Sequence, residues 1–143
     1  FSWVSLTYAT QTTAIINYSL AILFFGYVSY SILMYVLNSK KVSGNIIAGG
    51  ICVYLTVGLV FAFIFTLIEF LAPGSFSSNS SGPLFITDFI YFSYVTLTTL
   101  GYGDISPIAA YAQSIVILEA ITGVLFLAVF IARIVGLYDS KKK

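Results

Sequence analysis

One short stretch of the chain combines two glycines with hydroxyl and carboxyl groups in a pattern that could bind a cation. It covers residues 96–104 and reads Thr-Leu-Thr-Thr-Leu-Gly-Tyr-Gly-Asp. Gly101 and Gly103 can adopt φ angles that a side chain disfavours, so their alternation with ordinary residues can turn successive carbonyl groups to one side. Such a row of oxygen atoms suits a hard, weakly hydrated cation. The Thr99 hydroxyl would add one more oxygen at the inner end.

The composition indicates that a membrane surrounds this stretch. Of the 143 residues, 59% are hydrophobic and only 8% are charged, whereas soluble domains carry about a quarter charged residues. Three segments exceed the roughly 20 apolar residues that cross a lipid bilayer. They cover about residues 13–37, 46–71 and 108–137. We therefore expect an all-α membrane protein with three transmembrane helices.

A fourth segment, residues 84–98, is too short and too rich in hydroxyl groups to cross the bilayer. It is typical of a re-entrant helix, which a membrane tolerates only where protein buries it or water lines it. Thr87 is the expected N-cap, and Asp88 directly after it suits the positive end of the helix dipole. The C-terminal end of this helix carries partial negative charge, which favours a cation in a cavity there.

Residues 99–104 resemble the selectivity filter of potassium channels, which reads Thr-Val-Gly-Tyr-Gly-Asp, with Leu100 in the valine position. In that family the filter carbonyls replace the hydration shell of K⁺, so the resemblance implies a potassium-selective pore with K⁺ as its one cofactor. The ion ligands that it implies are Thr99, Leu100, Gly101, Tyr102 and Gly103. Because the family's filter is a ring of four strands, one filter per chain implies a homotetramer.

The resemblance covers about residues 46–138 and divides the chain into two parts. Residues 1–45 form an N-terminal segment with one transmembrane helix, and residues 46–143 form the pore domain. The expected parts of the pore domain are the outer helix 46–71, the turret 72–83, the pore helix 87–98, the filter 99–104 and the inner helix 108–138. A tight turn that happens to contain Gly-Tyr-Gly is the competing interpretation, and six matching positions between membrane-length segments disfavour it.

Several side chains are expected to support the filter. In the family, the position four residues before the filter threonine is sometimes a glutamate that pairs with the filter aspartate. Here this position is Val95, so Asp104 must find another partner or face water. Three aromatic residues of the pore helix are expected to hold the filter as a cuff and to pack the helix: Tyr91, Phe92 and Tyr94. The support positions are Asp104, Val95, Thr98 and Glu119.

Glu119 lies within the third span, where a carboxyl group is costly and by default suggests function. By helical projection it faces the back of the re-entrant helix, where a hydroxyl group of Thr96, Thr98 or Tyr94 would satisfy it. Two roles stay open, namely structural support of the filter and a direct part in conduction or pH gating. Arg133 projects away from the cavity and is expected to extend to the lipid headgroups.

Gly123 lies 24 residues after Thr99, where many potassium channels place a hinge glycine in the inner helix. The alternative is a small residue that allows close helix packing. At about 100° per residue, one stripe of the helix holds four apolar side chains. They are Val124, Leu127, Ile131 and Val135. This stripe would line a cavity below the filter as a hydrophobic gate, or it would pack between helices.

Basic residues predict the orientation of this multi-pass protein in the cell membrane. Lys40 and Lys41 lie between the first two spans, and residues 141–143 are lysines that follow the last span. Cytoplasmic loops collect Lys and Arg. Both clusters are cytoplasmic if the re-entrant segment does not cross, and the N-terminus and the linker 72–83 are then extracellular.

Other functions are disfavoured by what the chain contains. No segment carries Arg or Lys at every third residue, so we expect no voltage sensor in this chain. With no histidine and one cysteine, no nucleophile–base pair or set of metal ligands can be assembled for an enzyme. A net charge of +1 gives no basis for a nucleic-acid partner. A non-selective cation channel and a non-conducting accessory subunit are alternatives that the intact filter disfavours. A potassium-transporter subunit would use several re-entrant loops with one glycine each, and this chain has one loop with two glycines. A helix before Phe1 and a cytoplasmic regulatory domain after Lys143 are left open.

Overall fold

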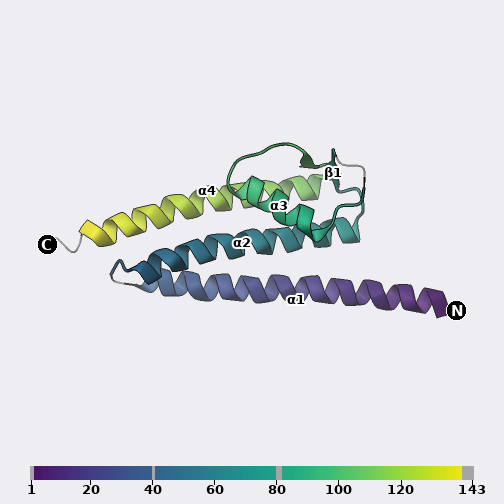
Figure 1. Ribbon diagram of the computed structural model, residues 1–143, viewed down its shortest axis with the longest axis horizontal. Coiled ribbons are helices and arrows are strands. Elements are labelled where there is room, and N and C mark those ends of the chain that lie inside the picture. The colour runs from purple at the N-terminus through teal and green to yellow at the C-terminus, as the bar shows by residue number, and fades with distance from the viewer. Residues whose placement is uncertain (1, 40, 80–81, 140–143) are drawn as a thin grey trace.

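Three long helices run along the molecule (Figure 1). The computed structural model describes residues 2–39, 41–79 and 82–139. The long helices are α1 Ser2–Asn38, α2 Gly44–Leu71 and α4 Ala110–Asp139. Each contains a segment long and apolar enough to cross a membrane, in agreement with the predicted all-α membrane protein. Since α1 begins at Ser2, the residues before the first predicted span continue the same helix.

The short elements gather at one end of the molecule, and the α1–α2 turn and the C-terminal end of α4 lie at the other (Figure 1). The helix α1 packs along α2, and the short helix α3, Ile86–Leu97, packs on both α2 and α4. The arrangement therefore brings the α1–α2 turn and the end of α4 to the same side. Lys40 and residues 141–143 lie outside the described residues, so the side on which they lie stays a prediction.

Two short strands flank α3 and the filter motif in the sequence. Strand β1, Phe76–Ser78, pairs antiparallel with β2, Ile105–Pro107, and Ser77 lies opposite Ser106. The sequence analysis predicted no strand here, because three residues are too few to show the alternating pattern of a strand. The pairing ties the segment after α2 to the segment that follows residue 104.

The N-terminus of α3 differs from the prediction. The helix begins at Ile86 with Phe85 as its N-cap residue, so the expected cap at Thr87 is wrong. Asp88 lies in the first turn as predicted, and its Oδ2 accepts a hydrogen bond of 2.7 Å from the Phe85 backbone N–H. This carboxylate satisfies a backbone group just before the helix and suits the positive end of the helix dipole.

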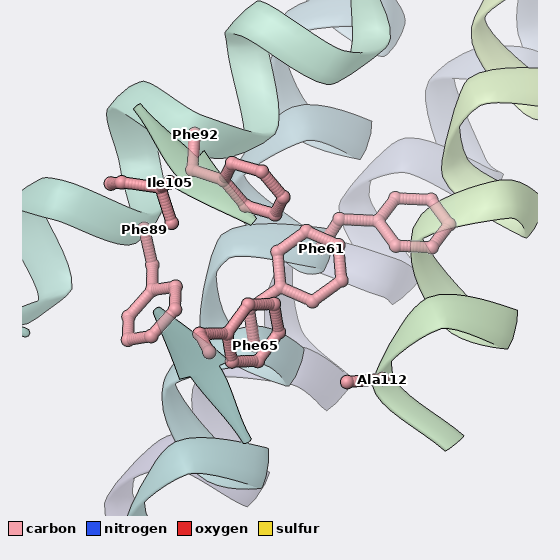
Figure 2. Close-up of a cluster of buried hydrophobic side chains, with 7 residues drawn as sticks. Phe61, Phe65, Phe89, Phe92, Ile105 and Ala112 are labelled. Atoms are coloured by element: carbon pink, nitrogen blue, oxygen red, sulfur yellow. The ribbon is translucent and has the colours of Figure 1, made fainter. Parts of the chain in front are cut away.

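An aromatic core fixes α3 and both strands onto α2 (Figure 2). Phe65 and Phe89 are fully buried, and Phe76 of β1 lies between them, with ring centroids 5.6 Å and 5.0 Å away. The remaining members are Phe61, Phe92, Ile105 and Ala112. Aromatic rings bury large apolar areas and prefer such tilted or edge-on contacts. The core therefore holds the helix that delivers the chain into residues 98–104.

Candidate ion-conducting site

The backbone of the filter motif alternates between two conformations. Thr99, Gly101 and Gly103 have φ angles of 61°, 58° and 76°, whereas Leu100 and Tyr102 between them have no positive φ. The alternation at the two glycines was predicted, and its extension to Thr99 was not. A positive φ at a β-branched residue is a genuine outlier and costs about 1–3 kcal/mol. Such strain persists only where surrounding contacts impose it.

Two hydrogen bonds from the motif to α3 impose this conformation. The Val95 carbonyl accepts hydrogen bonds from the backbone N–H groups of Leu100 at 2.9 Å and Gly101 at 3.3 Å. No peptide bond among the described residues is cis, and in a trans peptide the carbonyl points opposite to the N–H of the same unit. The carbonyls of Thr99 and Leu100 therefore both point away from α3. Two successive oxygen atoms thus face the same side of the chain.

The side of the motif that faces away from α3 is open. Thr99, Gly101 and Gly103 are exposed, and the side chains of Leu100 and Tyr102 are 56% and 65% exposed. Among the described residues no group of three or more His, Cys, Asp or Glu side chains gathers to hold a metal ion.

A hollow of about 340 Å³ lies beside the inner end of the motif. It is lined by Thr99 and by residues of α4, and Val124 of the predicted apolar stripe is among them. The other stripe residues, Leu127, Ile131 and Val135, follow along α4 with exposed side chains. One face of α4 is therefore apolar and uncovered from the level of Thr99 towards the C-terminal end of the helix.

The outer end of the motif is held by Tyr91. Its hydroxyl donates a hydrogen bond of 2.8 Å to Asp104 Oδ2, and its ring stacks on Tyr102 with centroids 6.5 Å apart and an interplanar angle of 7°. The hydrogen bond to Asp104 raises the pKa of the Tyr91 phenol. Asp104 thus finds its partner on α3 although Val95 stands at the family's glutamate position. The buried Val95 contributes its carbonyl oxygen instead.

The predicted aromatic cuff is divided between two tasks. Of the three, Tyr91 is the one whose side chain contacts residues 99–104 among the described interactions. Phe92 belongs to the aromatic core, and the Tyr94 hydroxyl donates a hydrogen bond of 2.8 Å to the Leu55 carbonyl of α2. Thr98, the C-cap of α3, donates its hydroxyl proton to the Tyr94 carbonyl at 2.6 Å. These contacts fix α3 on α2 and shape the end of α3.

Glu119 of α4 lies behind α3 and is fully buried. Its Oε1 contacts Ser93 Oγ, which also lies 2.7 Å from the Gly58 carbonyl of α2. The expected region is correct, but the expected partners Thr96, Thr98 and Tyr94 are wrong. Projection around a helix gives the direction of a side chain, and Ser93 occupies that face at the height of Glu119. Its Oε2 has no hydrogen-bond partner among the described residues.

Gly123 packs closely against the end of α3. A Cβ atom there would lie 2.5 Å from the Leu97 carbonyl oxygen, which also accepts a hydrogen bond of 3.0 Å from the Tyr54 hydroxyl. The helix α4 continues through this position. The contact favours the packing alternative for Gly123, and its role as a hinge stays a prediction.

Arg133 contacts the end of α1, whereas the sequence analysis predicted that it extends to the lipid headgroups. Its Nη2 donates to the carbonyl oxygens of Leu37 and Ser39, at the C-terminal end of α1, and the Ser39 contact is 3.0 Å long. The last carbonyls of a helix lack partners within the helix, and a nearby cation suits the negative end of its dipole. Arg133 therefore joins α4 to α1, a pairing that no local pattern in the sequence could indicate.

A family model described as an ion channel matches residues 49–139. The chain belongs to this ion channel family. The match begins in α2 and runs to the end of α4, so α1 lies before it. The family consists of channels rather than enzymes.

Together with the family model, two relatives named as potassium channels confirm the resemblance to a potassium channel pore domain. The inward rectifier potassium channel Kirbac3.1 of Paramagnetospirillum magnetotacticum is 39% identical over 80 residues, covering 53% of this chain and 24% of the relative. Two-pore potassium channel 4 of Arabidopsis thaliana is 38% identical over 84 residues, covering 59% of this chain and 26% of the relative. Protein LctB of Bacillus caldotenax is 32% identical over 93 residues, covering 62% of this chain and 69% of the relative. The chain thus spans about a quarter of each of the two named potassium channels. No solved structure matches the chain significantly.

Proposed function

We propose that four copies of this chain form a potassium-selective pore lined by residues 99–103. The observation that carries the proposal is the alternating backbone of Thr99, Gly101 and Gly103, with the carbonyls of Thr99 and Leu100 both directed away from α3. Carbonyl oxygens in such a row replace the hydration shell of K⁺ in potassium channels. The names of two relatives, both potassium channels, support the same ion.

We infer the number of copies from the side of residues 99–103 that is exposed in a single chain. Residues 99–103 are exposed on one side, and non-helical backbone at membrane depth must be buried in protein or must line a water-filled cavity. A single strand cannot surround an ion, whereas four filter loops do so in potassium channels. We therefore assign α3 as the re-entrant pore helix and a homotetramer as the conducting form.

The inner helix supplies the rest of the conduction path. The four stripe residues of α4 are between 42% and 62% exposed: Val124, Leu127, Ile131 and Val135. We assign them to the wall of a cavity below the filter, where an apolar constriction can close by dewetting. We place the α1–α2 turn and the end of α4 on the cytoplasmic side, and we place residues 72–83 and the N-terminus on the extracellular side. We assign no voltage sensing to the chain, since no helix carries regularly spaced Arg or Lys.

Reconstitution in liposomes tests the proposal. The purified chain is expected to conduct with a reversal potential near the K⁺ equilibrium value under a K⁺/Na⁺ gradient, and to run as an assembly of four 15.6 kDa chains. Gly101→Ala places a side chain at a φ of +58° and should abolish the selective current. Gly26→Ala, in α1 with open space around the new Cβ, is the matched control and should conduct normally.

Two outcomes would contradict the proposal. A reversal potential near zero would make the chain a non-selective cation channel. The absence of any current from a tetramer that is folded and oriented both ways would make it a non-conducting subunit.

A further inference from the structure

Ser93 lies between two oxygen atoms that belong to two other helices. Its Oγ contacts Glu119 Oε1 of α4 and lies 2.7 Å from the carbonyl oxygen of Gly58 in α2. Neither contact is longer than the usual O–H···O distance of about 2.7–2.8 Å. Both contacts therefore require a proton between their oxygen atoms, because two oxygens at this separation repel each other without one.

A serine hydroxyl has only one proton to give. The Gly58 carbonyl can only accept, so the Ser93 proton is needed for that contact. The proton between Ser93 Oγ and Glu119 Oε1 must then come from the carboxyl group. A single proton shared by both acceptors would produce two long, bent contacts, and neither contact here is long.

We propose that Glu119 is a neutral carboxylic acid that donates its proton to Ser93 Oγ, and that Ser93 in turn donates to the Gly58 carbonyl. This hydrogen-bonded relay joins α4, α3 and α2 behind the filter motif. Glu119 acts as a positioning residue, since it touches Ser93 and not residues 99–103.

The surroundings of Glu119 fit an uncharged group. Its Oε2 is buried without a partner among the described residues, which a neutral carbonyl oxygen tolerates far better than a carboxylate. Tyr54 of α2 and Tyr94 of α3 are titratable side chains on the helices that meet here, and each hydroxyl donates to a backbone carbonyl elsewhere. Arg133 lies 14 residues further along α4, about 21 Å at 1.5 Å per residue.

No other copy of the chain can contact the Glu119 carboxyl group directly. Glu119 is 0% exposed in one chain alone, so its own chain covers it on all sides. The missing partner of Oε2 can therefore not come from a neighbouring subunit in an assembly. This enclosure makes the protonation state a property of the single chain.

The relay positions the part of α3 that holds the filter motif. Ser93 lies on the turn of α3 just before Val95, whose carbonyl accepts the Leu100 and Gly101 N–H groups. The effect of the relay on conduction rests on the proposed function, whereas the proton on Glu119 does not. The two claims can therefore be tested separately.

Infrared spectroscopy of the full chain in lipid vesicles tests the proton directly. The chain contains two glutamates, Glu69 and Glu119, so ¹³C-labelled glutamate shifts the bands of these side chains alone. Glu69 accepts hydrogen bonds from the backbone N–H groups of Gly74 at 2.7 Å and Phe76 at 3.0 Å, as a carboxylate does. At neutral pH we expect one labelled carboxylate and one labelled protonated carboxyl band.

Three variants assign the protonated carboxyl band to Glu119 and test the role of the relay. Glu119→Gln should remove the protonated band, Glu69→Gln should leave it, and Ser93→Ala should shift its frequency, because the proton loses its acceptor. The amide that Glu119→Gln introduces can still donate to Ser93, so the K⁺ flux of this variant should stay within about twofold of that of the unmodified chain.

Three results would overturn the inference. They are two labelled carboxylates in the unmodified chain, a protonated band that survives Glu119→Gln, or loss of flux in a folded Glu119→Gln tetramer. If this variant does not fold, the spectrum of the unmodified chain decides alone. A protonated band from vesicles without K⁺-selective flux would leave the inference standing and would contradict the proposed function instead.

Discussion

The Tyr91 hydroxyl and the Asp104 carboxylate are joined by a hydrogen bond of 2.8 Å at the outer end of the filter motif. One turn further along α3, the Val95 carbonyl accepts the N–H groups of Leu100 and Gly101 in the same motif. A single short helix thus holds both ends of residues 99–104, about 6 Å apart along its axis. Substitutions on α3 should therefore alter the conformation of the filter motif.

Tyr91→Phe should weaken the outer end of the filter. The substitution keeps the ring that stacks on Tyr102 and removes the hydroxyl that Asp104 accepts. We expect K⁺ currents that decay faster during sustained conduction, measured in planar bilayers with the reconstituted chain. Tyr27→Phe in α1, where the side chain is 71% exposed, is the control and should behave like the unmodified chain. Equal decay in both variants would show that the hydrogen bond does not hold the filter.

The same hydrogen bond predicts a dependence on alkaline pH. Bonding to Asp104 raises the pKa of Tyr91 above its usual value of 10.0, because the protonated phenol is the form that donates. A raised pKa in the folded chain stabilises it fully below pH 10.0, and this stabilisation is lost as the pH rises through the folded value. The difference in thermal stability between the unmodified chain and Tyr91→Phe should be constant near neutral pH and shrink above pH 10.0. A difference that widens there would contradict the assignment.

Gly123→Ala distinguishes close packing from hinge bending. The new Cβ would lie 2.5 Å from the Leu97 carbonyl oxygen, a backbone atom that cannot move aside cheaply. We expect a loss of about 1–3 kcal/mol in the free energy of unfolding, measured by denaturant titration in detergent. Gly26→Ala meets open space and should gain up to about 1 kcal/mol from helix propensity. A Gly123→Ala chain with normal stability but altered gating would identify a hinge instead.

Arg133→Met should loosen the C-terminal end of α1. The variant keeps an apolar stem and removes the guanidinium that donates to the Leu37 and Ser39 carbonyls. Loss of hydrogen bonds from a charged donor costs about 1–3 kcal/mol, so amide hydrogen exchange near residue 39 should accelerate. Lys41→Met, in the same turn, removes an exposed charge without these bonds and should exchange like the unmodified chain. Unchanged exchange in Arg133→Met would show that lipid or water replaces the contact.

The features predicted from the sequence are those that depend on local composition. Apolar length is enough to indicate the three long helices, because nothing shorter satisfies the backbone across a bilayer. Glycine at positions 101 and 103 permits the positive φ angles found there. The direction of Glu119 towards α3 follows from helical geometry alone.

The features that the sequence could not predict depend on contacts between distant residues. Thr99 has a strained φ because the Val95 carbonyl accepts hydrogen bonds from the backbone N–H groups of the two residues after Thr99. The choice of Ser93 over other hydroxyls depends on the relative heights of two packed helices. The bond from Arg133 to Leu37 joins residues 96 positions apart. No local sequence pattern encodes such contacts between distant residues.

The pairing of β1 with β2 has a consequence for the order of folding. The two strands close a loop of 26 residues, 79–104, which contains α3 and the filter motif. The strand pairing joins the two ends of this loop, and the Val95 and Tyr91 bonds join residues within it. The loop can therefore close before the chain meets another copy. In the proposed tetramer, assembly would then bring together loops that have already closed rather than fold them against one another.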